Sequence, residues 1–343
     1  MNKQKVILIF STISVITVFF IILGFVFNKT EIEKINGLTE VYDVSADGTI
    51  AYVTYNSGKP ELYLKTGDKE RLALQHNQGE IIQDIAFSPS ENRLVYILSN
   101  QDLDTNSKSY INLLEVHSLE TKNLYEAEGI ITEIVFDPKD EQQLFFLKAS
   151  TFENYSPIAR ENPHEFDIYS YDIESNNETR HTSWEQYDMQ SLNVSYFEEA
   201  VYIQMLDIES ESAEEIFEAK QKVYKVPLEN PEQLTVISDE NRDVHIFDFV
   251  ILPDETGMIF QSISNWEDGG TFQYELFFYD WKRNEETRLT NLKQYAGEPL
   301  ITSNGDKVYF IVNKKFASKY SDHYLYVMNF DGKNIKDVPL AHR

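Results

Sequence analysis

Residues 279–290, YDWKRNEETRLT, repeat an earlier stretch of the same chain. Residues 171–182 read YDIESNNETRHT, and the two stretches agree at seven of twelve positions with an offset of 108 residues. An internal repeat must be considered first, because a missed period misassigns the whole fold. A period of 108 is too long for most single supersecondary units, but it fits two units of about 54 residues, which is the size of a propeller blade.

From residue 41 onward, the chain repeats a pattern of four short apolar strands separated by turns. Pro, Asp, Asn and Gly supply the backbone angles and local hydrogen bonds that tight turns need. Several second strands are apolar at consecutive positions, which is typical of strands covered on both faces. The first turns of the successive units are 45–48, 88–92, 137–140, 195–198, 252–257 and 302–305.

Six such units predict an all-β protein, a six-bladed β-propeller of four-stranded antiparallel blades. A pair of β-sandwiches or a β-solenoid is the alternative. Sandwiches rarely repeat so evenly, and solenoid coils are shorter than roughly 30 residues, so the propeller is favoured.

One unit carries a recognisable family pattern. Residues 298–310, EPLITSNGDKVYF, resemble the box E-P-x-W-S-P-D-G-x-K-[IV]-x-F of TolB-like (PD40) propeller repeats, and TRLT at 287–290 resembles the strand before that box. The resemblance covers six degenerate units over residues 41–340 and implies a TolB-like six-bladed propeller. TolB itself is not implied, because TolB has a separate α/β domain before its propeller, and the Tol partners are not carried over.

The N-terminal region contains an uncharged run of 22 residues, 6–27, after Lys3 and Lys5. A run of that length spans a bilayer core. A cleaved signal peptide is the alternative, but the apolar part is longer than usual and ends without a small-x-small site. We therefore expect a cytoplasmic tail over 1–5, a transmembrane signal-anchor over 6–27, a linker over 28–40 and the propeller over 41–343. The two lysines favour a cytoplasmic N-terminus and an extracytoplasmic propeller in the cell membrane.

Acidic residues dominate the remainder of the chain. Over the whole chain, the 57 Asp and Glu residues outnumber the 30 Lys and Arg residues, for a formal net charge of -27. This balance argues against nucleic acid and anionic lipid headgroups as partners, because both would be repelled. Cations, basic proteins or solubility alone remain as explanations. The absence of cysteine excludes disulfides and thiolate metal sites, and it fits an extracytoplasmic bacterial protein that is stabilised by its core.

Equivalent positions of a propeller gather near the mouth of its central channel. Counting back four residues from each first turn gives Val41, Asp84, Glu133, Ser191, Asp248 and Glu298. Four of the six are acids, and grouped carboxylates raise one another's pKa unless a cation compensates. Oxygen ligands suit Ca²⁺ or Mg²⁺. The candidate acidic ring is Asp84, Glu133, Asp248 and Glu298, and a divalent cation, a basic ligand and a solvated rim all remain open.

Long loops join the second and third strands of five units, and propeller topology places them on one face. Binding residues concentrate on such loops when a rigid scaffold holds them. The candidate loop-face residues are Phe152, Tyr155, Arg160, His164 and Trp266, although an ordinary surface loop is the alternative. A capping box at 212–215, SAEE, predicts a short acidic helix on the same face.

No local catalytic signature is present. G-x-S-x-G, H-E-x-x-H and phosphate-binding glycine loops are missing, and the seven histidines lack ligand spacing. We therefore expect a non-catalytic binding or scaffold module for a protein or cell-envelope ligand, with no assigned catalytic residue. The alternative is a hydrolase-type or lyase-type enzyme, or a divalent-cation site, at the acidic channel mouth.

Overall fold

The computed structural model describes residues 3–27, 30–101, 107–151, 163–206, 219–267, 270–318 and 321–342. Helix α1 (Lys3–Phe27) is followed by the short helix η1 (Ile32–Lys34). Side chains of α1 are described only for Lys5 and residues 10–24. Over the described residues, no helix combines the length and apolarity that crossing a bilayer requires. The anchor over 6–27 stays a prediction from the sequence.

The regular secondary structure in the rest of the described chain is almost entirely strand, in successive sets of four strands that we call units one to six. The bounds in the first three units are β1 (Gly37–Val44), β2 (Ile50–Asn56), β3 (Lys59–Thr66), β4 (Lys69–Gln75), β5 (Glu80–Phe87), β6 (Arg93–Asn100), β7 (Lys108–Glu115), β8 (Thr121–Glu128), β9 (Ile130–Asp137), β10 (Asp140–Thr151), β11 (His164–Asp172) and β12 (Asn177–Arg180). The first strand begins at Gly37, inside the segment expected to be linker.

The remaining three units have the same organisation. Their bounds are β13 (Met189–Val194), β14 (Ala200–Leu206), β15 (Gln221–Pro227), β16 (Thr235–Val236), β17 (Ile246–Ile251), β18 (Gly257–Ile263), β19 (Tyr274–Asp280), β20 (Glu285–Arg288), β21 (Tyr295–Ile301), β22 (Lys307–Asn313), β23 (His323–Asn329) and β24 (Lys336–Asp337). A further short helix, η3 (Pro231–Gln233), precedes β16.

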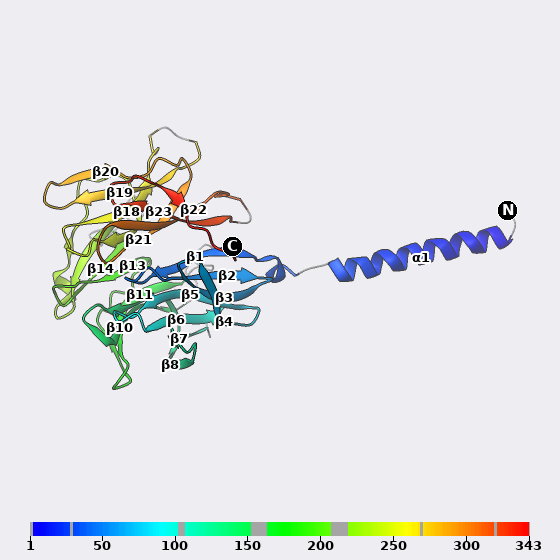
Figure 1. The fold of residues 1–343 in the computed structure, drawn as a ribbon, viewed down its shortest axis with the longest axis horizontal. Helices are drawn as coiled ribbons and strands as arrows, with labels where there is room; N and C mark the ends of the chain where they lie inside the picture. The colour runs from blue at the N-terminus through cyan, green and yellow to red at the C-terminus, as the bar shows by residue number, and fades with distance from the viewer. Residues whose placement is uncertain are drawn as a thin grey trace.

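Each unit is an antiparallel sheet whose strands pair in chain order. Units one to four are separate sheets, and units five and six are linked through one parallel pair, Tyr274 with Tyr295. The first strand of every unit contacts the first strand of the next, and β21 returns to contact β1. This circular succession is the arrangement of a β-propeller, and Figure 1 shows the C-terminus beside β1, with α1 outside the strand-rich body.

The core is divided among the junctions between units. Six apolar clusters are present in the described chain, one at each junction, and the cluster between units six and one includes Tyr52, Ile311 and Leu325. The second strands are covered by neighbours on both faces, and every residue of β18 is buried. This explains the consecutive apolar residues in the sequence, because neither face of such a strand meets water.

Two opposite ends of the strand body follow from this topology. We call the end that carries the β2–β3 type of connection, together with the start of each first strand, the loop face. The turns between first and second strands, and between third and fourth strands, lie at the opposite end. The loop-face position of the long connections follows from the antiparallel order of each unit.

The repeated stretches cover the end of the third strand, a turn and the fourth strand of units three and five. Asp280 holds its turn by accepting hydrogen bonds from the N–H groups of Lys282 and Arg283. Arg288 lies 3.1 Å from the buried carboxylate of Glu275, and the Thr290 hydroxyl donates to the same carboxylate. Asp280 therefore stabilises the turn after the third strand, and Arg288 pairs with the buried Glu275 carboxylate.

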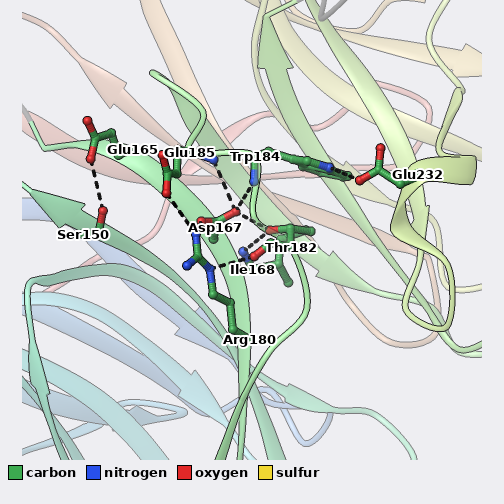
Figure 2. Close-up of polar contacts among 9 residues, drawn as sticks. All are labelled: Ser150, Glu165, Asp167, Ile168, Arg180, Thr182, Trp184, Glu185 and Glu232. Carbon is green, nitrogen blue, oxygen red and sulfur yellow. Dashed lines mark hydrogen bonds and ion pairs between the residues drawn. The ribbon is translucent and has the colours of Figure 1, made fainter.

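Unit three uses the same device around Asp167. This carboxylate is buried and accepts hydrogen bonds from Arg180, from the Thr182 hydroxyl at 2.7 Å and from the Trp184 N–H at 2.8 Å. Figure 2 shows these groups converging on Asp167, with Trp184 also donating to Glu232. The shared Thr-Arg-x-Thr part of the internal repeat thus fixes the connection into the following unit.

Candidate functional site

The first strand of every unit is irregular near its middle. Pairing shifts register between Leu38 and Tyr42, Ile82 and Ile85, Gln190 and Asn193, Ile246 and Asp248, Gly297 and Leu300, and opposite Leu147 and Lys148 in unit three. Such bulges bend a strand and redirect a side chain. Ser191 and Glu298 have left-handed φ values of 60° and 51° at these bulges. The irregularities fall at or beside the positions selected from the sequence.

A central cavity of about 1080 Å³ lies inside the ring of first strands. The four members of the candidate acidic ring, Asp84, Glu133, Asp248 and Glu298, all line it. Residues near the β2–β3 type of connection also line it, including Tyr55, Gln101, Ser321 and His323, so the cavity reaches the loop face. Residues 31–36, which precede β1, contribute to the same wall.

Two of the acids join neighbouring units. Glu133 in unit three accepts hydrogen bonds from the N–H groups of Ser191 at 2.8 Å and Leu192 at 2.7 Å in unit four. Asp84 in unit two accepts one from the Ile134 N–H in unit three at 2.8 Å. These carboxylates satisfy amides that the bulges remove from the strand ladder, so they support the ring as well as line the cavity.

Units one and four lack an acid at the selected position, and they use the residue two places later. The Asp43 carboxylate accepts from the Phe87 N–H of unit two at 2.7 Å. The Asn193 side-chain oxygen accepts from the Ile251 N–H of unit five at 3.1 Å. Sequence reasoning missed both residues because the comparison was fixed to one position. A signal was present in the sequence, because an Asp or Asn follows two residues after each of the two non-acidic positions, Val41 and Ser191.

The other two acids are less fully bonded. Asp248 accepts from the Ser191 hydroxyl and its own neighbour Phe249 through Oδ1. The Glu298 N–H approaches this carboxyl, but the buried Oδ2 atom has no hydrogen-bond partner among the described residues. The Glu298 backbone carbonyl accepts from the Tyr42 hydroxyl at 2.5 Å. No hydrogen bond within the described chain reaches the Glu298 carboxyl group.

The cavity raises the pKa values of its acids. Burial raises the pKa of Asp43 and Asp248 to about 6 and that of Glu133 to about 7, although hydrogen-bond donors oppose these shifts. Burial also raises the pKa of Asp84 well above its usual range, and for Glu298 the nearby Asp248 and Glu40 add to burial. The side chains are half-buried because they face the cavity, yet they lie deep within the protein.

These acids are distributed around the cavity rather than gathered at one point. Among the residues that the structure describes, no three His, Asp or Glu side chains are placed to hold one metal ion. The arrangement provides separated acceptors that can exchange protons near neutral pH. Such acceptors suit a ligand with several positive or hydrogen-donating groups.

The predicted loop-face residues have different positions. Trp266 is 42% exposed. His164 is 1% exposed and stacks on Tyr187 with ring centroids 5.9 Å apart, so it is packed within the fold rather than presented on the surface. Phe152, Tyr155, Arg160 and the capping box at 212–215 lie outside the described residues.

Comparison with known proteins identifies the fold. No family model matches the chain, and no curated protein matches it. TolB from Acinetobacter baumannii is similar with a TM-score of 0.59 and 13% identity, covering 88% of this chain and 79% of that one. An oligogalacturonate lyase in complex with manganese has a TM-score of 0.55 and 12% identity, covering 85% and 77%.

A third solved structure extends the comparison. The β-propeller domain of the Trilobed protease from Pyrococcus furiosus, described as having an open velcro topology, has a TM-score of 0.52 and 13% identity, covering 90% of this chain and 85% of that one. Likeness at these identities establishes fold alone. The chain has the fold of TolB-like β-propellers.

Proposed function

We propose that this TolB-like propeller is a non-catalytic binding module whose central cavity receives a cationic group from a protein or cell-envelope ligand. The observation that carries the proposal is Asp248 Oδ2, a buried oxygen without a hydrogen-bond partner among the described residues, together with the nearby cavity acid Glu298, whose pKa is raised by burial and by Asp248. A buried carboxyl group without a donor costs free energy. A ligand ammonium or guanidinium group supplies the missing donors and favours the charged form of both acids.

The shape of the cavity favours an organic cation. A volume of about 1080 Å³ accommodates several side chains, and acids from different units face it. A lysine ammonium group has three donors and an arginine guanidinium group has five, so a basic polypeptide segment can engage acceptors from several strands at once. The strongly negative chain also draws a basic partner toward the protein.

The six units form six blades in this proposal. The support is the apolar cluster at each junction and the circular contacts from β1 through β21 and back to β1. The last blade has its own four strands, β21–β24, and the first has β1–β4. The ring therefore closes by side-chain packing and hydrogen bonds between blades one and six.

The proposed location is the outer side of the cell membrane, with the N-terminus in the cytoplasm. The support is the uncharged run over 6–27 and the preceding lysines. The absence of native cysteine permits a direct test with the single-cysteine variants Gln4→Cys and Ala46→Cys, the second at an exposed turn position. A membrane-impermeant maleimide should label the second in intact cells and the first only after lysis. Labelling of the first in intact cells would contradict the orientation.

The binding role is tested by cross-linking the full-length protein in membranes and purifying it. A reproducible partner should be recovered with the wild-type protein and lost with Glu298→Gln at equal expression. Glu120→Gln, a change at an exposed acid outside the cavity, should retain the partner. Equal recovery with all three proteins would reject the cavity as the binding site.

An enzymatic role is the second candidate. Burial raises the pKa of Glu133 to about 7 and that of Asp248 to about 6, which places both groups in the range of general acids and bases. One structurally similar protein is an oligogalacturonate lyase in complex with manganese. The test is incubation of the purified protein with oligogalacturonate and Mn²⁺, followed by detection of unsaturated product. Turnover that is lost in Asp248→Asn would favour this candidate.

A further inference from the structure

The segment before the first strand is fixed to the loop face. The Gly58 N–H donates to the Ile35 carbonyl at 2.9 Å, and the Ser57 N–H donates to the Asn36 side chain at 2.8 Å. A Cβ atom at Gly58 would lie 2.4 Å from the Ile32 carbonyl oxygen, so this close approach needs glycine. These contacts are in the β2–β3 connection. The chain therefore enters the propeller at the loop face.

This attachment limits the distance between the anchor and the loop face. Helix α1 ends at Phe27 and η1 begins at Ile32. The five Cα-to-Cα steps from Phe27 to Ile32 extend over about 18 Å at most. If 6–27 spans the bilayer as proposed, the loop face lies close to the membrane surface.

A connected set of aromatic rings occupies the loop face of units five and six, and we call it the aromatic patch. Its members are His245, Phe247, Trp266, Phe272, Tyr274, Tyr295 and Phe316. Trp266 stacks on Phe272 with ring centroids 5.5 Å apart, and Tyr295 stacks on Phe316 at 4.9 Å. Trp266, Phe272 and Phe316 are about two-fifths exposed, at 42%, 41% and 39%.

Hydrogen bonds join described residues on the two sides of the loop that carries Trp266. Asn265 donates to the Thr271 carbonyl at 3.0 Å and accepts from the Gln273 N–H at 2.8 Å. The Lys220 ammonium lies 5.7 Å from the Trp266 ring centroid. An exposed tryptophan with a lysine alongside is typical of the interface between lipid and water, where the ring is partly apolar and the lysine reaches the headgroups.

Two exposed aromatic residues also lie at the opposite end. Tyr196 and Phe197 are 47% and 68% exposed, but both belong to the single β13–β14 turn. The aromatic patch instead joins two units and continues to the cavity through Phe247, which lines it. An extended patch of this kind marks a contact surface.

We infer that the loop face is held against the bilayer and that the aromatic patch sits in the lipid headgroup region. This inference rests on the proposed membrane anchor. The short connection brings the surface to the bilayer, and the exposed rings supply the apolar contact. The acidic chain favours zwitterionic over anionic lipid for this contact. The cavity then opens toward the membrane, so its ligand approaches along the membrane surface.

The three tryptophans of the chain permit a matched test. One full-length variant, Trp184→Phe with Trp281→Phe, retains only Trp266. The other, Trp184→Phe with Trp266→Phe, retains only Trp281, which follows β19 at the opposite end of the propeller. Both are reconstituted into phosphatidylcholine vesicles whose acyl chains carry bromine near the headgroup. Circular dichroism and thermal unfolding confirm that both variants are folded.

The expected result is at least about twofold stronger bromine quenching of Trp266 than of Trp281. Flotation with the vesicles is measured on the same samples. If both variants float and Trp266 is quenched no more than Trp281, the anchor holds and the inferred lipid contact is wrong. If neither floats, the anchor itself is wrong and the inference falls with it. Neither outcome decides whether the cavity binds a cationic ligand, which is tested separately.

Discussion

The backbone N–H of Ser191 donates to Glu133 at 2.8 Å, so a carboxylate of the third unit holds the first strand of the fourth. A second donor, the Leu192 N–H, reaches the other oxygen of the same carboxylate. Glu298 occupies the equivalent position in the sixth unit, but no described residue donates a hydrogen bond to its carboxyl group. Residues that looked equivalent in the sequence therefore have different physical roles.

Removal of the Glu133 carboxylate should destabilise the protein. We expect Glu133→Ala to lower the free energy of unfolding by about 1–3 kcal/mol, because the amides of Ser191 and Leu192 lose their acceptor. Urea denaturation of the full-length protein in detergent measures the change. The control is Glu120→Gln, which alters an exposed acid and should change stability by less than about 0.5 kcal/mol. Equal stability of Glu133→Ala and wild type would contradict the structural role.

Neutralising Glu298 should have the opposite effect. At pH 8, we expect Glu298→Gln to raise the melting temperature by a few degrees, because a carboxyl group that is costly to ionise is replaced by an uncharged amide. The gain should shrink as the pH falls, since the raised pKa of Glu298 favours its protonated form in the folded protein. A lower melting temperature at pH 8 would show that the carboxylate is stabilised by its surroundings.

The cavity acids should make the wild-type protein more stable in mild acid. The folded-state pKa values of Asp43 and Asp248 are raised to about 6 and that of Glu133 to about 7, so the folded state binds more protons than the unfolded state. The contribution of these groups to stability is fully present below their unfolded-state pKa values, which are about 4, and is lost as the pH rises through the raised folded-state values. Melting temperatures between pH 5 and 8 should therefore decline. A rise over this interval would contradict the raised values.

The junction between units six and one provides a second pH-dependent contact. His323 lies 3.4 Å from Glu40, and its other ring nitrogen contacts the Leu38 carbonyl at 3.0 Å. Burial lowers the pKa of His323, whereas Glu40 and the Leu38 carbonyl raise it. The raising effects together are larger, so the net shift of the pKa is upward. The resulting stabilisation is present below the ordinary histidine pKa and disappears as pH rises through the raised value.

We therefore expect His323→Asn to destabilise the protein more at pH 5.5 than at pH 8, measured by urea denaturation. The matched variant is Tyr42→Phe, which removes the hydroxyl that donates to the Glu298 carbonyl. Its loss of about 1 kcal/mol should be nearly equal at both pH values. An equal effect of His323→Asn at both pH values would exclude protonated His323 as a stabilising group.

The fold was accessible from the sequence because each unit repeats its own turns. The apolar second strands recur in every unit, the Thr-Arg-x-Thr segment recurs in units three and five, and the acids Asp84, Glu133, Asp248 and Glu298 occupy equivalent positions. All four acids line the central cavity. The sequence does not distinguish their roles, since hydrogen bonding depends on the neighbouring unit and on the bulge that orients each side chain.

The aromatic patch was harder to predict from the sequence, for a related reason. Only Trp266 was selected from the sequence, because it lies in a long loop. Phe247, Tyr295 and Phe316 come from other segments and meet it only through the packing of units five and six. Asp43 was missed because its unit places the acceptor two residues later. Contacts between units that are distant in the chain have no local pattern.

The most direct measurement of the central claim is calorimetric binding of tetralysine to the full-length protein at pH 6.5, repeated in buffers of different ionisation enthalpy. The wild-type protein should bind tetralysine, and this binding should release protons. A cation in the cavity favours the ionised forms of acids whose pKa values are raised. Glu298→Gln should bind about tenfold more weakly, or about 1.4 kcal/mol, whereas Glu120→Gln should match the wild type. Equal affinity for all three proteins without proton release would contradict a cation-binding cavity.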